Sequence, residues 1–199
     1  MHVGNFSQSV PLHDRMKLTT QHWLLGGLGL LILLLPKKAK GNTSNSLPGA
    51  RDCSVPRGIR NNNPGNIVVS SSAWKGKISY DQNTDYNCNT GKIERRFEQF
   101  VSYEYGIRAM ILLLKNYITR DGLNTVRRII EKWAPASDGN NVNNYASLVA
   151  TYSGLHIDAP FTATPVTLKL LTKAMAKVEN GRDCISDRQF DDAWLLSIA

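Results

Sequence analysis

A long apolar stretch near the N-terminus is the feature that most limits what this sequence can fold into. From Trp23 to Leu35 there is no polar side chain, and the wider tract Leu18–Pro36 reads LTTQHWLLGGLGLLILLLP. A helix over this tract would be roughly 28 Å long at about 1.5 Å per residue, close to the ~30 Å hydrocarbon core of a bilayer. A helix buried in a protein core would rarely lack any polar face. The tract therefore predicts a transmembrane helix over residues 18–36, preceded by an N-terminal tail over residues 1–17.

The residues that follow the apolar tract bear on whether it is retained. Lys37, Lys38 and Lys40 come directly after it, whereas a cleaved signal peptide would have small, uncharged residues there. We therefore expect the helix to be kept as an anchor. The sequence leaves the orientation of this anchor open, although lysines on its C-terminal side favour, by the positive-inside rule, a domain in the cytoplasm or inside a virion. Residues 37–56 are basic and polar, with Gly, Ser and Pro, and predict a linker.

The positive charge is concentrated in front of the predicted domain, which spans residues 57–199. The net charge is +8; residues 1–52 contain six Lys or Arg and two Asp, whereas residues 53–199 contain eighteen Lys or Arg and fourteen Asp or Glu. The domain is thus only mildly basic, which argues against a dedicated duplex-DNA binder. Mild positive charge suits a diffuse polyanion such as a membrane surface or a cell-wall polymer.

Cysteine and histidine usage excludes a typical metal site. The three cysteines, Cys53, Cys88 and Cys184, have no metal-ligand spacing. One disulfide can form if the domain reaches an oxidising compartment. We favour Cys53 as one partner because it would tie the start of the domain to a distant segment; three free thiols are the alternative. Only His156 lies beyond the apolar tract, which disfavours a zinc amidase or peptidase. No metal or cofactor is predicted.

The domain changes character along its length. Residues 66–100 have short β-rich runs separated by Asn and Gly, which predict a hairpin or small sheet. Beyond residue 102, apolar residues recur at helical spacing, and caps and glycines divide this part into five helices. The first helix starts at Ser102 and ends before Gly122. The next three lie between Thr125 and Pro135, between Asn141 and Gly154, and between Thr164 and Gly181. The fifth starts at a capping box formed by Ser186 and Gln189. The predicted fold class is α+β, mainly α.

Five motifs in this domain, taken in order, resemble a known family. They are GIRNNNPGNI (58–67), W-x-G (74–76), RFEQF-x-S-x-E-x-GIRAM (96–110), GLNTVRRIIEKWAP (122–135) and NNYASLVATYSG (143–154). The set is similar to small phage proteins: virion-associated peptidoglycan-degrading enzymes of the lysozyme-like, lytic transglycosylase-like superfamily, related to the lytic enzyme of enveloped double-stranded-RNA phages. The resemblance covers Arg57 to about Gly154. It implies a mainly helical lysozyme-like domain with a small β-hairpin, here preceded by one transmembrane helix.

The resemblance also implies a function. The chain would be a single-pass protein of a virion membrane or host inner membrane that acts on the periplasmic cell wall during genome entry or host lysis. It would cleave the glycan strand of peptidoglycan, as a muramidase or lytic transglycosylase. Its partners would be peptidoglycan, the lipid membrane and other virion proteins, but no nucleic acid. The alternatives are a murein endopeptidase on the same fold and a non-enzymatic virion membrane protein that binds the wall.

Cutting a sugar–sugar bond requires a carboxylic acid beside the scissile oxygen. Glu104 is the predicted acid because it lies three residues before Ile107, on the core-facing stripe of its helix, and just before Gly106. Burial there would raise its pKa, whereas the helix N-terminus would lower it. The alternative role for Glu104 is to stabilise the first helical turn and pair with Arg108 four residues on.

The remaining carboxylates are weaker candidates. Glu98, on a predicted strand, and Asp81, in the predicted hairpin, are the alternatives for the catalytic acid. Asp81 or Asp85 could instead supply a second carboxylate, although DQNTD is first of all typical of a polar turn. Glu131 is predicted on the surface, and Glu179, beside an Asn-Gly helix stop, is predicted to be a solvated helix end.

Amides and aromatic side chains supply the predicted glycan-binding surface. The asparagines of GIRNNNPGNI are expected to build a rigid turn, with one or two amides facing the glycan. Flat aromatic rings can pack against sugars, although core packing is the alternative for Trp133 and Tyr145 on their helical stripes. The predicted substrate-binding residues are Asn61, Asn62, Asn63, Asn66, Trp74 and Tyr145.

Overall fold

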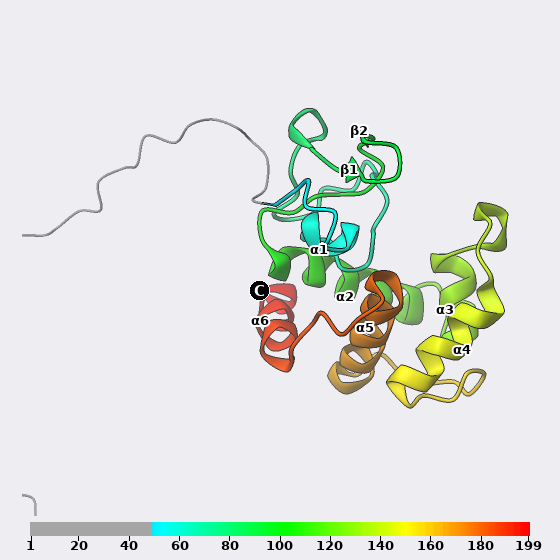
Figure 1. The fold of residues 1–199 in the computed structure, drawn as a ribbon. Helices are drawn as coiled ribbons and strands as arrows, with labels where there is room; N and C mark the ends of the chain where they lie inside the picture. The colour runs from blue at the N-terminus through cyan, green and yellow to red at the C-terminus, as the bar shows by residue number, and fades with distance from the viewer. Residues whose placement is uncertain (1–48) are drawn as a thin grey trace, which may run out of the picture. The chain divides into compact units, whose positions relative to one another are not determined.

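The computed structural model describes residues 49–199, so the predicted tail, transmembrane helix and most of the linker lie outside the described residues. Within residues 49–199, no helix combines the length and apolar character needed to cross a membrane. The described part contains six α-helices, two short 3₁₀ helices and a two-stranded antiparallel sheet (Figure 1). The predicted class, α+β and mainly α, is confirmed.

All five predicted helices are present. They are α2 (Tyr103–Thr119), α3 (Val126–Trp133), α4 (Val142–Ser153), α5 (Pro165–Asn180) and α6 (Asp187–Ile198). The side chains of Thr125 and Thr164 accept hydrogen bonds from backbone N–H groups of their first helical turns, and Ser186 forms the predicted capping box with Gln189. Ser102 occupies the cap position of α2, but its side chain makes no capping hydrogen bond. These local signals fix the helix limits because they satisfy N–H groups that have no partner inside the helix.

The β element is smaller than the sequence predicted. It consists of β1 (Tyr86–Asn87) paired with β2 (Lys92–Ile93). The segment around Glu98, predicted as a strand, makes only isolated bridges at Phe97 and Phe100. Its backbone hydrogen bonds go to several separate segments, including Glu98 N to Ile67 O and Phe100 N to Asn61 O. A continuous ladder therefore does not form.

The asparagine-rich segment folds as a short helix, α1 (Arg57–Arg60), followed by a stiff loop. Asn62 and Asn66 take positive φ angles of 51° and 48°, a conformation that asparagine tolerates better than most residues. Asn61 and Asn63 are fully buried, and the side-chain amide of Asn63 holds the loop: its Nδ2 donates to the carbonyls of Ile67 and Glu98, and its Oδ1 accepts from Ile67 N. The predicted rigid turn is confirmed.

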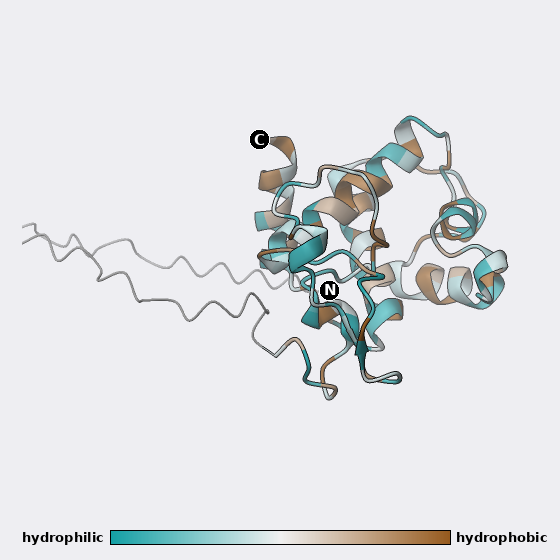
Figure 2. Ribbon diagram, turned by 90° about the horizontal axis from the view of Figure 1, so that it is seen from above, coloured by the Kyte–Doolittle hydropathy of each residue, from teal (hydrophilic) through white to brown (hydrophobic). Residues whose placement is uncertain are grey.

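Helix α2 is the centre of the described domain and packs against α3, α5 and α6. Its predicted stripe is buried: Ile107, Met110, Ile111 and Leu114 have no exposed surface. Figure 2 shows that the long helices carry both hydrophobic and hydrophilic residues, as amphipathic helices do. The start of α2 lies directly against the asparagine loop. Gly106 allows this close approach, since a Cβ at its position would be only 1.8 Å from Asn62 O.

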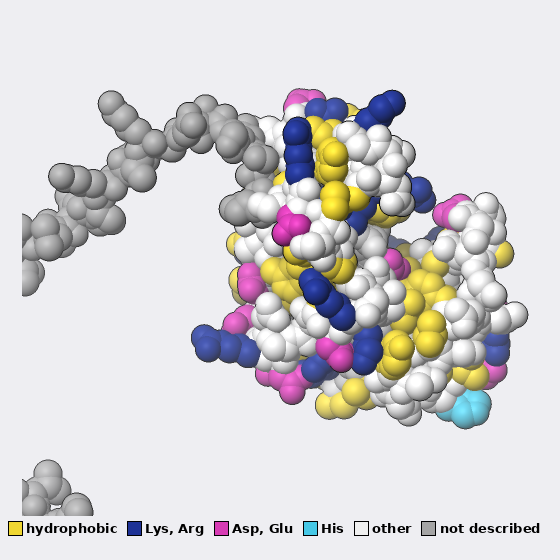
Figure 3. Space-filling model, in the orientation of Figure 1, with side chains coloured by type: hydrophobic (Ala, Val, Ile, Leu, Met, Phe, Trp, Pro, Cys, Tyr) yellow, Lys and Arg dark blue, Asp and Glu magenta, His cyan; other side chains and the backbone are white. Residues whose placement is uncertain are grey.

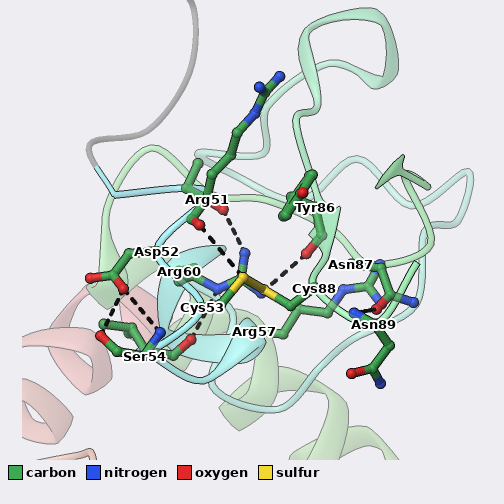
Figure 4. Close-up of a disulfide and its surroundings, with 12 residues drawn as sticks. Arg51, Asp52, Cys53, Ser54, Arg57, Arg60, Tyr86, Asn87, Cys88 and Asn89 are labelled. Atoms are coloured by element: carbon green, nitrogen blue, oxygen red, sulfur yellow. Dashed lines mark hydrogen bonds between the residues drawn. A yellow bond between two sulfur atoms is a disulfide. The ribbon is translucent and has the colours of Figure 1, made fainter. Parts of the chain in front are cut away.

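A disulfide ties the segment before α1 to the hairpin. Cys53 and Cys88 are bonded, with a Cα–Cα distance of 5.9 Å, which confirms the prediction that Cys53 joins a distant segment (Figure 4). Beside the bridge, the buried Arg60 donates from Nε to Val55 O and from Nη2 to Tyr86 O. Cys184 is the free cysteine of the described part.

Candidate functional site

Two adjoining cavities form a groove beside the ends of three helices. The first has a volume of about 300 Å³ and the second about 170 Å³, and both are lined by Asn66, Val68 and Trp133. Further lining residues of the first cavity are Ile67, Ser70, Ser72, Trp74, Leu113 and Tyr117. The second cavity is completed by Arg96, Phe97, Ala134, Asp138, Asn140, Tyr145 and Glu179. Figure 3 shows the surface hollowed between the part that carries the hairpin and helices α3 and α4. We call the two cavities together the groove.

Glu179, in the last turn of α5, is a carboxylate that lines the second cavity of the groove. Its Oε1 accepts hydrogen bonds from Trp133 Nε1 at 3.1 Å and Tyr145 Oη at 2.6 Å, and its Oε2 accepts one from Asn66 Nδ2 at 2.9 Å. The side chain is half-buried. The prediction of a solvated helix end was wrong, because α3, α4 and the asparagine loop bring neutral donors onto this end of α5.

The hydrogen bonds give the two oxygens of Glu179 different roles. A carboxyl oxygen can accept about two hydrogen bonds, so Oε1 is saturated by Trp133 and Tyr145, whereas Oε2 retains one open position. Burial, followed by the nearby charge of Glu179, raises the pKa of Tyr145 well above its usual range. The hydroxyl of Tyr145 therefore keeps its proton and donates a hydrogen bond to Oε1.

Aromatic rings and an unpaired donor surround the first cavity. The rings of Tyr117 and Trp133 meet edge to face with their centroids 6.5 Å apart. Trp74 Nε1 is buried and has no hydrogen-bond partner among the described residues. An unpaired buried donor of this kind costs roughly 1–3 kcal/mol. Apolar ring faces combined with a few fixed polar groups are typical of a small-molecule or sugar site.

Comparison with known proteins places this chain among phage proteins. No protein-family model matches it. It is 32% identical over 128 residues to Protein P5 of Pseudoalteromonas phage PM2, an alignment that covers 63% of this chain and 71% of that protein. The chain belongs to the Protein P5 family. The bacteriophage connection expected from the motifs is therefore confirmed, and the name of the relative states no activity.

Three of the predicted binding residues of this P5-family chain line the groove: Asn66, Trp74 and Tyr145. The other three asparagines hold the loop instead. Asn61 Nδ2 donates to Asp85 Oδ1 at 2.7 Å, and Asn62 Nδ2 donates to Phe100 O at 3.0 Å. The side-chain amide of Asn63 is likewise occupied by the backbone of Ile67 and Glu98, so Asn66 alone of the four lines the groove.

Glu104, the predicted acid, does not line the groove of the P5-family chain. It lies half-buried in the first turn of α2 and makes no hydrogen bond or ion pair with another residue of the 49–199 segment. The alternative pairing with Arg108 does not form either, since Arg108 Nε donates to Leu196 O at 2.8 Å. Asp81 is exposed in the short 3₁₀ helix Tyr80–Gln82.

Glu98, an alternative for the catalytic acid, stabilises the loop that lines the first cavity. It is fully buried, and its Oε1 accepts from Ser70 N at 3.0 Å and from Lys77 Nζ at 2.9 Å. These bonds hold the loop that carries Ser72 and Trp74 into the first cavity. Glu131 is exposed, as predicted.

Asp85, considered as a second catalytic carboxylate, is a buried structural hub. It has no exposed surface and accepts bidentate hydrogen bonds from Arg57 at 2.6 Å, together with bonds from Asn61 Nδ2 and the backbone N–H groups of Arg96 and Phe97. Burial alone would raise its pKa, but these donors outweigh burial and lower the pKa below its usual value. A carboxylate saturated in this way cannot serve as a proton donor.

The groove also contains polar residues that the sequence did not single out. Asp138 and Asn140 follow α3, and Arg96 precedes the partly buried Phe97 and the buried residues Glu98 to Phe100. A signal for Glu179 was present in the sequence, because Trp133 and Tyr145 have polar tips that need partners when their rings are buried. The residue that supplies the acceptor is 34 positions from Tyr145, so only the fold reveals it.

Proposed function

We propose that this P5-family chain cleaves the glycan strand of peptidoglycan, as a muramidase or lytic transglycosylase, with Glu179 as the general acid. The observation that carries the proposal is a half-buried carboxyl group in a groove, with one oxygen saturated by neutral donors and the other oxygen open. Glycoside cleavage requires a carboxyl group that can protonate the leaving oxygen, and Glu179, with its open oxygen, lines the groove where a substrate would lie. The five motifs shared with phage cell-wall enzymes point to the same chemistry.

In this mechanism the aromatic residues hold the sugar and Glu179 transfers the proton. Sugar rings pack against Trp74, Trp133 and Tyr117, while Asn66 and Asn140 supply amide contacts at the second cavity. Glu179 Oε2 donates its proton to the glycosidic oxygen as the bond to the anomeric carbon breaks. A sugar hydroxyl or a water then attacks that carbon and returns a proton to Glu179.

Asp138, in the same cavity, is the one other carboxylate that the described lining residues bring near Glu179. It could stabilise the positive charge that develops on the sugar, as could the N-acetyl group of the substrate. A lytic transglycosylase needs only the one glutamate, because a hydroxyl of the sugar replaces water as the nucleophile. The products therefore distinguish the two reactions.

The expected membrane segment fits the same role. An anchor over residues 18–36 would hold the domain at a virion or host membrane, close to the wall that it digests during entry or lysis. The mild positive charge of the domain suits an anionic wall polymer.

The experiment compares two glutamate-to-glutamine variants on purified peptidoglycan. The 199-residue chain is incubated with sacculi and the products are identified by mass spectrometry: anhydro-sugars indicate a transglycosylase, new reducing ends a hydrolase and freed peptides an endopeptidase. A general acid contributes roughly 10²–10⁴-fold to rate. We expect Glu179→Gln to lose at least about 100-fold in rate and Glu104→Gln to keep the wild-type rate. A fully active Glu179→Gln chain would refute the assignment.

A wall-binding protein without activity is the second candidate function. It is favoured by the three hydrogen bonds of Glu179, which join α3, α4, α5 and the asparagine loop and would equally serve a purely structural role. In that case wild-type protein would bind sacculi and release no products. Tyr145→Phe is the structural control, because it removes one of these bonds and leaves the carboxyl group in place. A murein endopeptidase is less favoured, since neither His156 nor Cys184 lines the groove.

A further inference from the structure

Two arginines lie against the same aromatic ring, and only one of them is paired with acid side chains. The Arg57 guanidinium is 4.8 Å from the ring centroid of Phe97 and bonds to Asp85 and Glu94. The Arg96 guanidinium is 5.4 Å from the same centroid, is exposed, and has no hydrogen-bond or ion-pair partner in the part of the chain that the structure describes. Arg96 therefore carries an unneutralised charge at the second cavity of the groove.

The backbone fixes Arg96 in this place. Arg96 N donates to the buried Asp85 at 3.0 Å. The preceding residue, Arg95, has a φ of 52°, a conformation that residues other than glycine adopt at a cost and that often accompanies functional sites. Arg95 bonds to Asn83 O and lies over the Tyr80 ring. Consecutive arginines thus serve different purposes, and Arg96 is the one that lines the groove.

We infer that Arg96 binds a carboxylate on the substrate and makes the groove selective for acidic glycans over neutral ones. The inference rests on the proposed function of the groove. A guanidinium held on a ring face and without an internal acid partner is suited to bidentate recognition of a carboxylate. Peptidoglycan carries such groups on the lactyl ether or the peptide stems of every second sugar, whereas a chitin-type oligomer carries none.

Because Arg96 and Glu179 line the same cavity, a carboxylate bound to Arg96 would help to position the substrate at Glu179. That cavity has a volume of about 170 Å³, so the bound carboxylate would fix which sugar lies over Glu179. The cut would then fall at a constant position relative to the acidic substituent. A merely structural arginine would not produce this selectivity.

The test measures binding to three forms of glycan. The 199-residue chain and its Arg96→Gln and Arg96→Lys variants are titrated with solubilised peptidoglycan strands, with the same strands after carbodiimide amidation of their carboxyl groups, and with a neutral N-acetylglucosamine hexamer. A hydrogen bond to a charged group contributes about 1.5–3 kcal/mol, which is roughly 10- to 150-fold in affinity. We expect Arg96→Gln to lose at least about tenfold on native strands and nothing on the other two ligands, with partial recovery in Arg96→Lys.

Arg188→Gln is the matched control for net charge. Arg188 is 92% exposed on α6 and pairs weakly with Asp192, so the variant removes one positive charge away from the groove. An equal loss in Arg188→Gln would assign the effect to net charge and overturn the inference. So would an unchanged affinity of Arg96→Gln for native strands, or absence of wild-type binding to them. If wild-type protein binds native strands but releases no products, the proposed catalysis fails, while the comparison of variants still decides the role of Arg96.

Discussion

Replacing Asp85 by asparagine should destabilise the whole segment from α1 to β2. The carboxylate accepts five hydrogen bonds: two on Oδ1, from Arg57 Nε and Asn61 Nδ2, and three on Oδ2, from Arg57 Nη2, Arg96 N and Phe97 N. An asparagine of the same shape can accept at only one of the two oxygen positions. Two or three donors would then face an NH₂ group, and the half-buried Arg57 would lose its closest counter-charge.

The expected cost follows from the burial of this pair. The Asp85 side chain is 0% exposed and the Arg57 side chain 18% exposed, so water cannot replace the lost bonds at Asp85. Removing one partner of a buried ion pair typically costs about 3–5 kcal/mol. With a urea m-value of about 2 kcal/mol/M, the unfolding midpoint would fall by roughly 2 M. Urea titrations followed by circular dichroism would measure it.

The effect should depend on pH in a defined direction. The folded pKa of Asp85 lies below its usual value of 3.8, so the unfolded chain binds the proton more readily. The stabilisation by Asp85 is therefore complete above pH 3.8 and is lost as the pH falls through the folded pKa. The difference in unfolding free energy between wild type and Asp85→Asn should be constant near neutral pH and shrink in strong acid.

The control is Glu94→Gln, which removes the second acid partner of Arg57. Glu94 is on the exposed hairpin, where solvent screens the pair, so we expect little change in stability. A loss below about 1 kcal/mol in Asp85→Asn, of the size typical of an exposed pair, would refute the reasoning. A difference that stays constant into strong acid would refute the role assigned to the charge.

Three further changes test the packing around the groove. Replacing Cys53 and Cys88 by serine removes a disulfide with a sequence separation of 35. If chain entropy dominates, the free energy of unfolding should fall by about 3.8 kcal/mol. A urea midpoint equal to that of the oxidised wild type would contradict this. Gly106→Ala places a Cβ 1.8 Å from Asn62 O and should cost about 1–3 kcal/mol or more, seen as a lower thermal midpoint, whereas wild-type stability would show that the loop can move away. Gly58→Ala places a Cβ 2.7 Å from Asn180 Oδ1 and 3.0 Å from Asn66 Oδ1, so both stability and binding of peptidoglycan should fall. Unchanged binding would show that the amide of Asn66 does not contact the glycan.

The helical part of the domain follows from local sequence signals. Thr125, Thr164 and Ser186 cap their helices with their own side chains, and Gly154 and Gly181 end α4 and α5 at φ angles of 72° and 68°. Each signal acts within a few residues, so the sequence is sufficient to place these limits. The repeat of apolar residues along α2 likewise predicts its buried face, because helical geometry fixes which residues share a side.

The irregular part of the domain could not be predicted in the same way. Between Asn61 and Phe100 the backbone is held by side chains from distant positions, such as Asn83 Nδ2 donating to Phe97 O at 2.8 Å and Gln99 Oε1 accepting from Thr84 N at 2.7 Å. Such bonds leave no periodic pattern in the sequence. The residues are the polar ones that normally indicate a solvated turn, so the sequence around Asp85 predicts a turn and not a buried carboxylate.

The same limit explains why the sequence did not reveal the surroundings of Glu179. A glutamate followed by Asn-Gly at the end of a helix is usually solvated, and nothing within α5 contradicts that interpretation. What changes the environment is the return of the chain, which places Trp133 at the end of α3 and Tyr145 in α4 over the end of α5. Glu104 differs in both respects: it lies in the first turn of α2 as predicted, but its side chain makes no hydrogen bond within residues 49–199 and does not line the groove. A carboxyl group becomes a candidate acid when other segments enclose it, and the useful signal was therefore the pair of polar-tipped aromatic residues that needed an acceptor.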